Sequence, residues 1–299
     1  MSDEIAIPQP INRKPEDTKE RAPHPSEKPN KKARKLPSKP KGGTSRFEPA
    51  AIPVEVPSKG FLYQGLFDDK EAAQGIIRVK PLTLQEEKIL TTDRLIQSGK
   101  ALDMVLESCI KSDVDPYQLL STDRLYLLFY LRGMSYGLEY DFDVRCYHCG
   151  NNFIQTVEID KLPINIWGKA SEAVEPMVVT LPMTRATVEF RHMRGEDEQA
   201  MLEDANKPVS MNDIDQSVAD SVIKLVTQVT LEDGEKLSPR DRIDFLNNLI
   251  GADIDSIRDE LRDHESGIKQ LENIQCPRCQ GTLEFSVPLG RNFFRRQRS

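Results

Sequence analysis

The chain has 299 residues, with 41 basic and 48 acidic side chains, a formal net charge of -7 and 30% charged residues. This length is typical of about two domains of ordinary size. The longest apolar run, Leu125 to Leu131, falls well short of the roughly 18 residues that cross a bilayer, so we expect no membrane-spanning helix. The start, Met1 to Ile5, lacks the basic and apolar regions of a secretory signal, so we expect no export.

Residues 1–46 differ in composition from the rest of the chain. They contain 12 basic residues, 6 acidic residues and 8 of the 20 prolines, which gives a net charge of +6 here and -13 for the remainder. Without aromatic residues or apolar periodicity, this segment cannot bury enough surface to offset the entropy of ordering. We predict a disordered basic arm. Its cluster of Lys31, Lys32, Arg34 and Lys35 is either a solvated tail or a contact for an acidic protein surface or nucleic acid.

A packed protein begins near Phe47. Apolar residues at 52–56 and 61–63 flank the turn-forming sequence Pro57-Ser58-Lys59-Gly60, which predicts an opening β-hairpin. A short strand follows at 75–79.

Three helices are then expected. Thr83 and Glu86 stand at capping-box spacing at the start of the first helix, and an apolar stripe from Leu102 to Ile110 marks the second. Cys109 lies on that stripe, and we interpret it as a core residue because nothing nearby would lower its pKa. The third helix is expected to be capped by Ser121 or Thr122 and to end near Gly133.

A strand at 140–145, the sequence Cys146-Tyr147-His148-Cys149-Gly150 and a strand through Ile159 come next. This order is half of a zinc ribbon. Two thiolates three positions apart on a tight turn reach one tetrahedral ion, and the glycine lets the backbone reverse.

The second half of the chain repeats this order. It predicts a strand pair at 178–181 and 187–190, a helix after Gly195, an apolar helical stripe from 218 to 229, and a helix opened by Ser238-Pro239. An additional helix through 254–261 precedes Cys276-Pro277-Arg278-Cys279 and a strand at 283–287.

The expected fold is therefore α+β, with two related halves, each made of short β-hairpins, a three-helix cluster and one CxxC zinc-ribbon knuckle. The expected organisation is a disordered N-terminal arm at 1–46, a first repeat at 47–170, a second at 171–290, and a basic aromatic tail at 291–299.

Each half supplies two cysteines, whereas a closed structural zinc site needs four ligands. The simplest hypothesis is that Cys146, Cys149, Cys276 and Cys279 bind one structural Zn²⁺ that joins the halves. The alternatives are reduced thiols without metal, a redox CxxC site, and zinc bound between chains. A redox site is disfavoured because both pairs lie between strands and not at a helix N-terminus.

The sequence indicates no catalytic site. It lacks a phosphate-binding glycine loop, an HExxH helix and a GxSxG elbow. We interpret His148 as an exposed loop residue, and His192 and His264 as structural or surface groups, because none has a partner at ligand spacing.

The tail contains Phe293, Phe294, Arg295 and Arg296, two aromatic residues followed by arginines. This composition predicts that it docks into an acidic, apolar groove of a partner, with nucleic acid as the rival ligand.

Residues 54–165 carry a resemblance to a known family. The sequence from Val56 to Gly60, the sequence from Arg78 to Leu90 and the Cys146–Gly150 knuckle resemble those of the baseplate hub and hub-assembly proteins of contractile-tailed, T-even-type bacteriophages. The resemblance implies a late protein of tail assembly in the host cytoplasm, without enzymatic activity, which binds other tail or baseplate proteins and can remain in the virion.

Two hypotheses remain. The first is a structural or assembly protein of the baseplate, with zinc joining its two halves. The second is a nucleic-acid-binding zinc-ribbon protein that uses its basic arm and tail. The charge of -13 outside the arm favours the first, because it repels a duplex.

Overall fold

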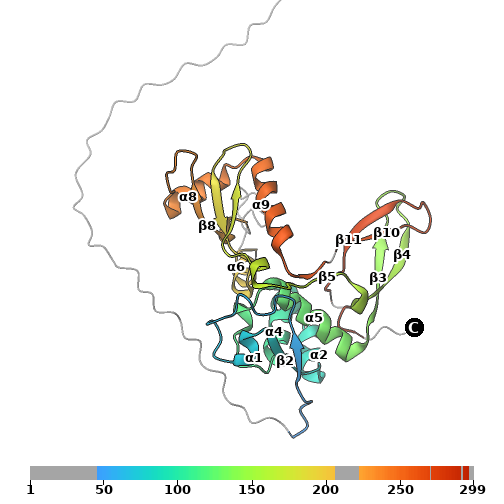
Figure 1. Cartoon of the computed structure of the whole chain (residues 1–299). Helices are drawn as coiled ribbons and strands as arrows, with labels where there is room; N and C mark the ends of the chain where they lie inside the picture. Colours follow the sequence, from blue (N-terminus) through green and yellow to red (C-terminus); the bar gives the residue numbers. More distant parts are fainter. Residues whose placement is uncertain (1–45, 206–221, 270, 291, 296–299) are drawn as a thin grey trace, which may run out of the picture. The chain divides into compact units, whose positions relative to one another are not determined.

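The computed structural model describes residues 46–205, 222–269, 271–290 and 292–295 (Figure 1). Contacts divide the chain into residues 1–48 and residues 49–299, and every element described below belongs to the second of these units. The predicted basic arm, with Lys31, Lys32, Arg34 and Lys35, lies outside the described residues, as does Arg296. None of the helices described is both long and apolar enough to cross a membrane.

The first sheet pairs β1 (Ile52–Glu55) antiparallel with β2 (Ile76–Val79). The prediction that residues 61–63 form the second strand of the opening hairpin is wrong, because that segment is a series of turns. Lys59 and Gly60 adopt left-handed backbone conformations there, and the chain returns through the short α1 (Lys70–Ala73). A Cβ atom on Gly75 would lie 2.5 Å from the Gly60 nitrogen, so this close approach requires glycine.

Four helices follow in the first part of the unit: α2 (Leu84–Thr91), α3 (Asp93–Gln97), α4 (Lys100–Cys109) and α5 (Ser121–Tyr136). A 3₁₀ turn, η1 (Pro116–Gln118), precedes α5. The predicted capping box of Thr83 and Glu86 is confirmed at the start of α2.

The predicted limits of α5 need correction. Leu120 is its N-cap and makes no side-chain capping bond, while the N–H of Ser121 donates to the Met193 carbonyl oxygen at 2.9 Å. The helix passes through Gly133 and ends at Gly137, whose φ of 96° breaks the helical backbone.

The second half contains a three-stranded antiparallel sheet in the order β6-β7-β8, formed by β6 (Met177–Thr180), β7 (Thr187–Phe190) and β8 (Val226–Thr230). The predicted helix over 218–229 is wrong in its last part, because only 222–225 are helical among its described residues. Residues from Val226 to Thr230 form a strand instead and pair with β7, and an irregularity at Glu189 and Phe190 interrupts the strict alternation, so that Val226 and Val229 are both buried.

Helices α8 (Pro239–Asn247) and α9 (Gly251–His264) pack on this sheet, whereas α6 (Gly195–Ala205) contacts η1 and α5. Ser238 caps α8, as predicted, by accepting from the N–H of Asp241. Asp253 of α9 is fully buried and accepts from the N–H groups of Met183 and Thr184, which ties α9 to the β6–β7 turn.

The segment that contains the three-stranded sheet is closed off by one small sheet, in which β5 (Ile164–Asn165), before it in the chain, pairs antiparallel with β9 (Gly267–Ile268), after it. The Nδ2 of Asn165 donates to the Glu265 carbonyl oxygen at 2.6 Å, and the indole of Trp167 donates to the His264 carbonyl oxygen at 3.2 Å. We call this region the β5–β9 clamp. Short 3₁₀ turns, η2 (Ile159–Lys161) and η3 (Ala170–Glu172), flank β5.

Two further hairpins complete the fold: β3 (Glu139–Arg145) with β4 (Asn152–Glu158), and β10 (Leu271–Gln275) with β11 (Thr282–Ser286). The architecture is thus α+β, with small antiparallel sheets, as expected from the sequence.

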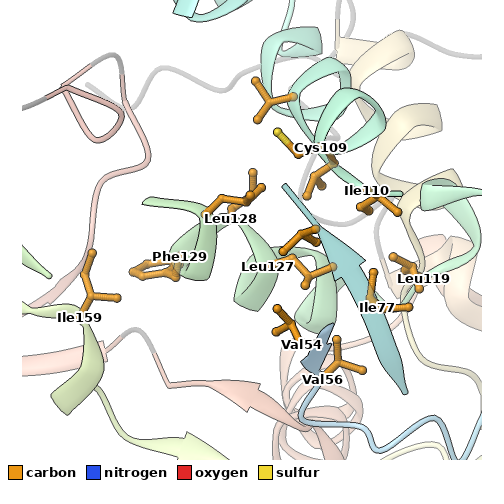
Figure 2. Packing of buried hydrophobic residues seen from close by; sticks show 14 of the residues in the cluster. Val54, Val56, Ile77, Cys109, Ile110, Leu119, Leu127, Leu128, Phe129 and Ile159 are labelled. Atoms are coloured by element: carbon orange, nitrogen blue, oxygen red, sulfur yellow. The ribbon is translucent and has the colours of Figure 1, made fainter. Parts of the chain in front are cut away.

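The buried apolar residues form three clusters. The largest gathers side chains from β1, β2, α4 and α5, which point into a common interior in Figure 2. Cys109 is a core residue of this cluster, as predicted, and burial raises the pKa of its thiol to about 12. The second cluster lies between the β6–β7–β8 sheet and its helices, and the third lies between the two CxxC hairpins.

Candidate metal centre

The first CxxC sequence forms the turn between β3 and β4. The N–H of Cys146 donates to the Asn151 carbonyl oxygen, and the N–H of Gly150 donates to the Cys146 carbonyl oxygen, both at 2.8 Å. Gly150 has a φ of 72°, the left-handed conformation that glycine adopts without strain. The sequence therefore folds locally into a tight knuckle that presents Cys146 and Cys149 on one side.

The second knuckle, between β10 and β11, has the same backbone with a different sequence. The N–H of Cys276 donates to the Gly281 carbonyl oxygen at 3.0 Å, and the N–H of Gln280 donates to the Cys276 carbonyl oxygen at 2.9 Å. The left-handed residue is Gln280, with a φ of 58°. The predicted turning role of Gly150 therefore fits the first knuckle, and a non-glycine residue takes that position in the second.

Gly281 has a different role. A Cβ atom there would lie 2.6 Å from the imidazole of His148, which packs across from the first knuckle. Tyr147 and His148 both reach the Thr282 carbonyl oxygen, at 3.0 Å from the Tyr147 hydroxyl and 3.2 Å from His148 Nε2. The glycine thus lets the two knuckles lie against each other.

This packing brings four sulfur atoms together. The Sγ atoms of Cys146, Cys149, Cys276 and Cys279 all lie within 4.8 Å of one another. The pairs Cys146–Cys279 and Cys149–Cys276 are each 3.7 Å apart. Zn–S bonds of about 2.3 Å place the sulfurs of a regular tetrahedron about 3.8 Å apart, so the donor set fits one tetrahedral ion.

The pKa values of two of the four thiols are shifted in opposite directions. The N–H groups of Cys279 and Arg278 donate to Cys276 Sγ, and the first of these bonds does most to lower the pKa of that thiol to about 6. The N–H of Asn151 likewise lowers the pKa of Cys149, but desolvation and the three neighbouring sulfurs outweigh it and raise that pKa to about 12. Four adjacent thiolates repel one another, and a bound cation removes that repulsion.

The hairpins that carry the knuckles have a small apolar interior. Cys146, Ile274, Cys276 and Leu283 are buried in it, and Phe142 and Phe285 stack at 4.8 Å between ring centroids. We call the four strands and both knuckles the ribbon module.

The histidines lie where the sequence interpretation expected them. His148 is exposed at the knuckle. His192 is buried against Trp167, and burial lowers its pKa to about 4. His264 is half-buried on α9 with its Nε2 3.1 Å from Glu260. In the part of the chain that the structure describes, the four cysteines are the one cluster of His, Cys, Asp or Glu placed to hold a metal ion.

The two aromatic residues of the tail, predicted to dock into a partner, lie inside this chain. Phe293 and Phe294 are only 0% and 3% exposed, and Phe293 makes edge contacts with Phe129 and Tyr140 at 5.0 and 5.1 Å. They are part of the chain's own core and do not form a free anchor for a partner. Arg295, next in the chain, is exposed.

The sequence analysis missed two buried polar networks. The carboxylate of Asp123 is fully buried and accepts from the backbone and hydroxyl of Ser58 and from Tyr63. Burial raises its pKa to about 6. The network explains the turn sequence at 57–60, because Ser58 must reach α5.

The second network lies within the sequence from Arg78 to Leu90. Lys80 and Glu86 form a buried ion pair at 2.8 Å, and Glu86 also accepts from Thr83 and Ser108. Burial alone would raise the pKa of Glu86, but Lys80 and these donors lower it to about 2. The polar residues of this sequence are thus part of the interior.

Comparison with known proteins gives one family. The model of the family described as T4 bacteriophage base plate protein matches residues 55–295. No curated protein and no solved structure matches the chain. The matched region includes both knuckles, the three apolar clusters except Val54, and most of the described residues. The chain therefore belongs to the T4 bacteriophage base plate protein family.

Proposed function

We propose that the protein is a non-enzymatic structural or assembly component of a phage tail baseplate, in which one Zn²⁺ bound by Cys146, Cys149, Cys276 and Cys279 closes the ribbon module. The metal assignment rests on one observation: four sulfur atoms come together from two knuckles that are 127 residues apart, measured from Cys149 to Cys276. The tail role is supported by the family match over residues 55–295. The protein acts with other tail or baseplate proteins, in the host cytoplasm during assembly and in the virion tail.

Zinc is the best candidate for this donor set. Tetrahedral sulfur ligands favour zinc or an iron–sulfur centre, and two CxxC knuckles on facing hairpins are the arrangement of structural zinc ribbons. A site with four thiolate ligands has no open position for substrate or water. Its contribution is folding free energy, on the order of 10 kcal/mol.

We further propose that the halves at 47–170 and 171–290 are related by duplication. In the first, β2 pairs with β1 on one side and bridges to Ile110, directly after α4, on the other. In the second, β7 pairs with β6 and with β8, which directly follows the helical residues 222–225. Each half then continues through helices to a CxxC hairpin, and this shared order supports the proposal.

Metal analysis tests the site. Native mass spectrometry of the full chain, combined with elemental analysis, should find one zinc per chain. The double variant Cys276→Ser, Cys279→Ser should contain none, while Cys109→Ala, which removes a core thiol, should keep the metal. Iron at one atom per chain, or equal zinc in all three proteins, would overturn the assignment.

Affinity capture from infected cells tests the tail role. Cross-linked tail proteins should be recovered with the wild-type chain. The rival function is nucleic-acid binding, and its sign would be tight, salt-dependent binding of a 30-nucleotide single strand at physiological salt. The family match and the acidic charge outside the arm favour the tail role over this alternative.

A further inference from the structure

The four clustered cysteines differ in how far solvent reaches them. Cys279 is exposed and Cys149 is half-buried, whereas Cys146 and Cys276 are buried between the two hairpins. Oxidants attack thiolates that they can reach, and a cysteine that binds zinc does so as a thiolate. The ribbon module therefore offers the sulfur of Cys279 to a small dissolved oxidant more openly than the other three.

Each of these sulfurs has a close neighbour on the opposite knuckle. Cys279 Sγ lies 3.7 Å from Cys146 Sγ, and Cys149 Sγ lies 3.7 Å from Cys276 Sγ. A disulfide bond is about 2.05 Å long, so each pair has to close by about 1.7 Å. The two sulfurs of a pair stand on different hairpins, and a small shift of one hairpin against the other supplies this movement.

The backbone of each knuckle opposes a disulfide within that knuckle. The N–H of Cys146 donates to the Asn151 carbonyl oxygen, and the N–H of Gly150 donates to the Cys146 carbonyl oxygen. The second knuckle has the same two bonds, made at Cys276. A disulfide inside one knuckle has to close within this fixed turn, and it leaves the two hairpins unlinked. The geometry therefore favours bonds across the knuckles.

We infer that a peroxide converts this site from a metal centre into two disulfides, Cys146–Cys279 and Cys149–Cys276, which keep the ribbon module closed after the metal has left. The inference rests on the proposed zinc site and adds to it a response to oxidants. A metal centre that is lost by oxidation would otherwise leave the two hairpins free to separate.

The first disulfide forms in two steps. The Cys279 thiolate attacks hydrogen peroxide: the S–O bond forms, the O–O bond breaks, and the leaving hydroxide takes up a proton, which gives a sulfenic acid and water. The Cys146 thiolate then attacks that sulfur: the S–S bond forms, the S–O bond breaks, and the second hydroxide is protonated to water. The two sulfurs have together given two electrons to the peroxide.

A second peroxide oxidises Cys149 and Cys276 in the same way. Zn²⁺ then has no thiolate ligand and is released into solution. The first cross-link already holds the knuckles together at this stage, so the remaining two sulfurs stay close enough to react with each other.

The proposed tail role exposes the protein to such a change of conditions. Glutathione and thioredoxin keep thiols reduced in a cytoplasm, and disulfides persist outside the cell. A baseplate protein that leaves the host with the virion loses the reductants that preserve a zinc–thiolate site. Disulfides across the knuckles would hold the same two hairpins together there.

The test uses the full-length, zinc-loaded chain and hydrogen peroxide. After oxidation, the chain is denatured, its free thiols are alkylated, and it is digested without reduction. Trypsin cleaves after Arg278 and chymotrypsin after Tyr147, so each of the four cysteines is on a separate peptide and every pairing gives a distinct mass. We expect release of zinc, measured with a chromogenic chelator, and the two disulfides across the knuckles. Cys109, which is fully buried in the core, should remain a free thiol.

A matched control and a comparison of two metal-free states complete the design. Cys109→Ala removes a thiol outside the cluster, so its zinc release should match that of the wild-type chain within twofold, with the same disulfides. Hydrogen–deuterium exchange then compares the oxidised chain with the reduced chain after chelation. Peptides covering 144–153 and 273–286 should exchange at least tenfold more slowly in the oxidised chain.

Three results would overturn the inference. The first is disulfides within the knuckles, Cys146–Cys149 and Cys276–Cys279. The second is retention of zinc, with all five thiols intact, in excess peroxide. The third is an oxidised chain whose knuckles exchange as fast as those of the reduced, chelated chain. Zinc content is measured before oxidation, so a chain without metal refutes the zinc site alone, while its disulfide map still decides the pairing.

Discussion

Removing two of the four sulfur ligands tests how the ribbon module is stabilised. In Cys276→Ser, Cys279→Ser, the module keeps both hairpins but loses half of the donor set. Its own apolar interior buries two aliphatic side chains, Ile274 and Leu283, besides two cysteines. Burying those two side chains contributes about 3 to 6 kcal/mol, and isolated two-stranded hairpins are marginal in water.

A structural zinc ion contributes on the order of 10 kcal/mol, more than this apolar interior. We therefore expect the ribbon module to open without the metal, while the largest apolar cluster, built mainly from β1, β2, α4 and α5, stays folded. The loss should be local, because most of that cluster lies outside the ribbon module.

Hydrogen–deuterium exchange followed by mass spectrometry measures this directly. Peptides covering 144–153 and 273–286 should lose most of their protection in the double serine variant and in the wild-type chain after chelation, whereas Tyr140, Phe142 and Val157 belong to the largest cluster and should hold the other ends of β3 and β4. Peptides covering α4 and α5 should keep theirs. Unchanged protection of both hairpins in metal-free protein would refute the reasoning, because the module would then be stable without an ion.

Three more substitutions test the interior. Asp123→Asn should flatten the pH dependence of the free energy of unfolding between pH 4 and 6, measured by urea unfolding. The folded-state pKa of Asp123, about 6, lies above the unfolded value, so the wild-type chain loses about 3 kcal/mol of unfolding free energy as pH rises through this window. Glu86→Ala should cost about 3 to 5 kcal/mol in the same assay, since it leaves Lys80 buried without its partner, and a loss below 1 kcal/mol would contradict the buried pair. Gly267→Val should lower the free energy of unfolding by more than about 2 kcal/mol, because Gly267 has a φ of 114° and an added Cβ would lie 2.9 Å from Thr122. An unchanged urea midpoint would show that the β5–β9 clamp adapts.

The parts of this fold that sequence analysis predicted are those set by local chemistry. Thr83 with Glu86, and Ser238 with Pro239, mark helix starts by capping bonds that span three residues. The CxxC spacing likewise placed two thiols on one turn in each knuckle, because that turn alone sets their separation, and the four sulfurs lie close enough to hold a metal ion.

The parts that it missed depend on residues far apart in the chain. The pairing of β1 with β2, the strand that follows residue 225, and the burial of Phe293 are decided by contacts with distant elements. At the site, the sequence analysis assigned a turning role to the glycine of the first knuckle only; in the second, Gln280 adopts the left-handed conformation and Gly281 makes room for His148. No local pattern distinguishes those two roles.

The number of residues between the two knuckles determines how much chain entropy a bound metal would remove. Linking Cys149 to Cys276, 127 residues apart, removes about 5 kcal/mol of chain entropy from an otherwise open chain. The β5–β9 clamp, however, already joins Ile164 to Ile268. The remaining path between the two knuckles is therefore only 15 residues from Cys149 to Ile164 and 8 residues from Ile268 to Cys276. A cross-link closing that shorter path removes about 3 kcal/mol. The clamp therefore carries part of the long-range closure. The proposed metal would mainly order the ribbon module, and we expect its removal to open the knuckle end of that module while the β5–β9 clamp stays paired.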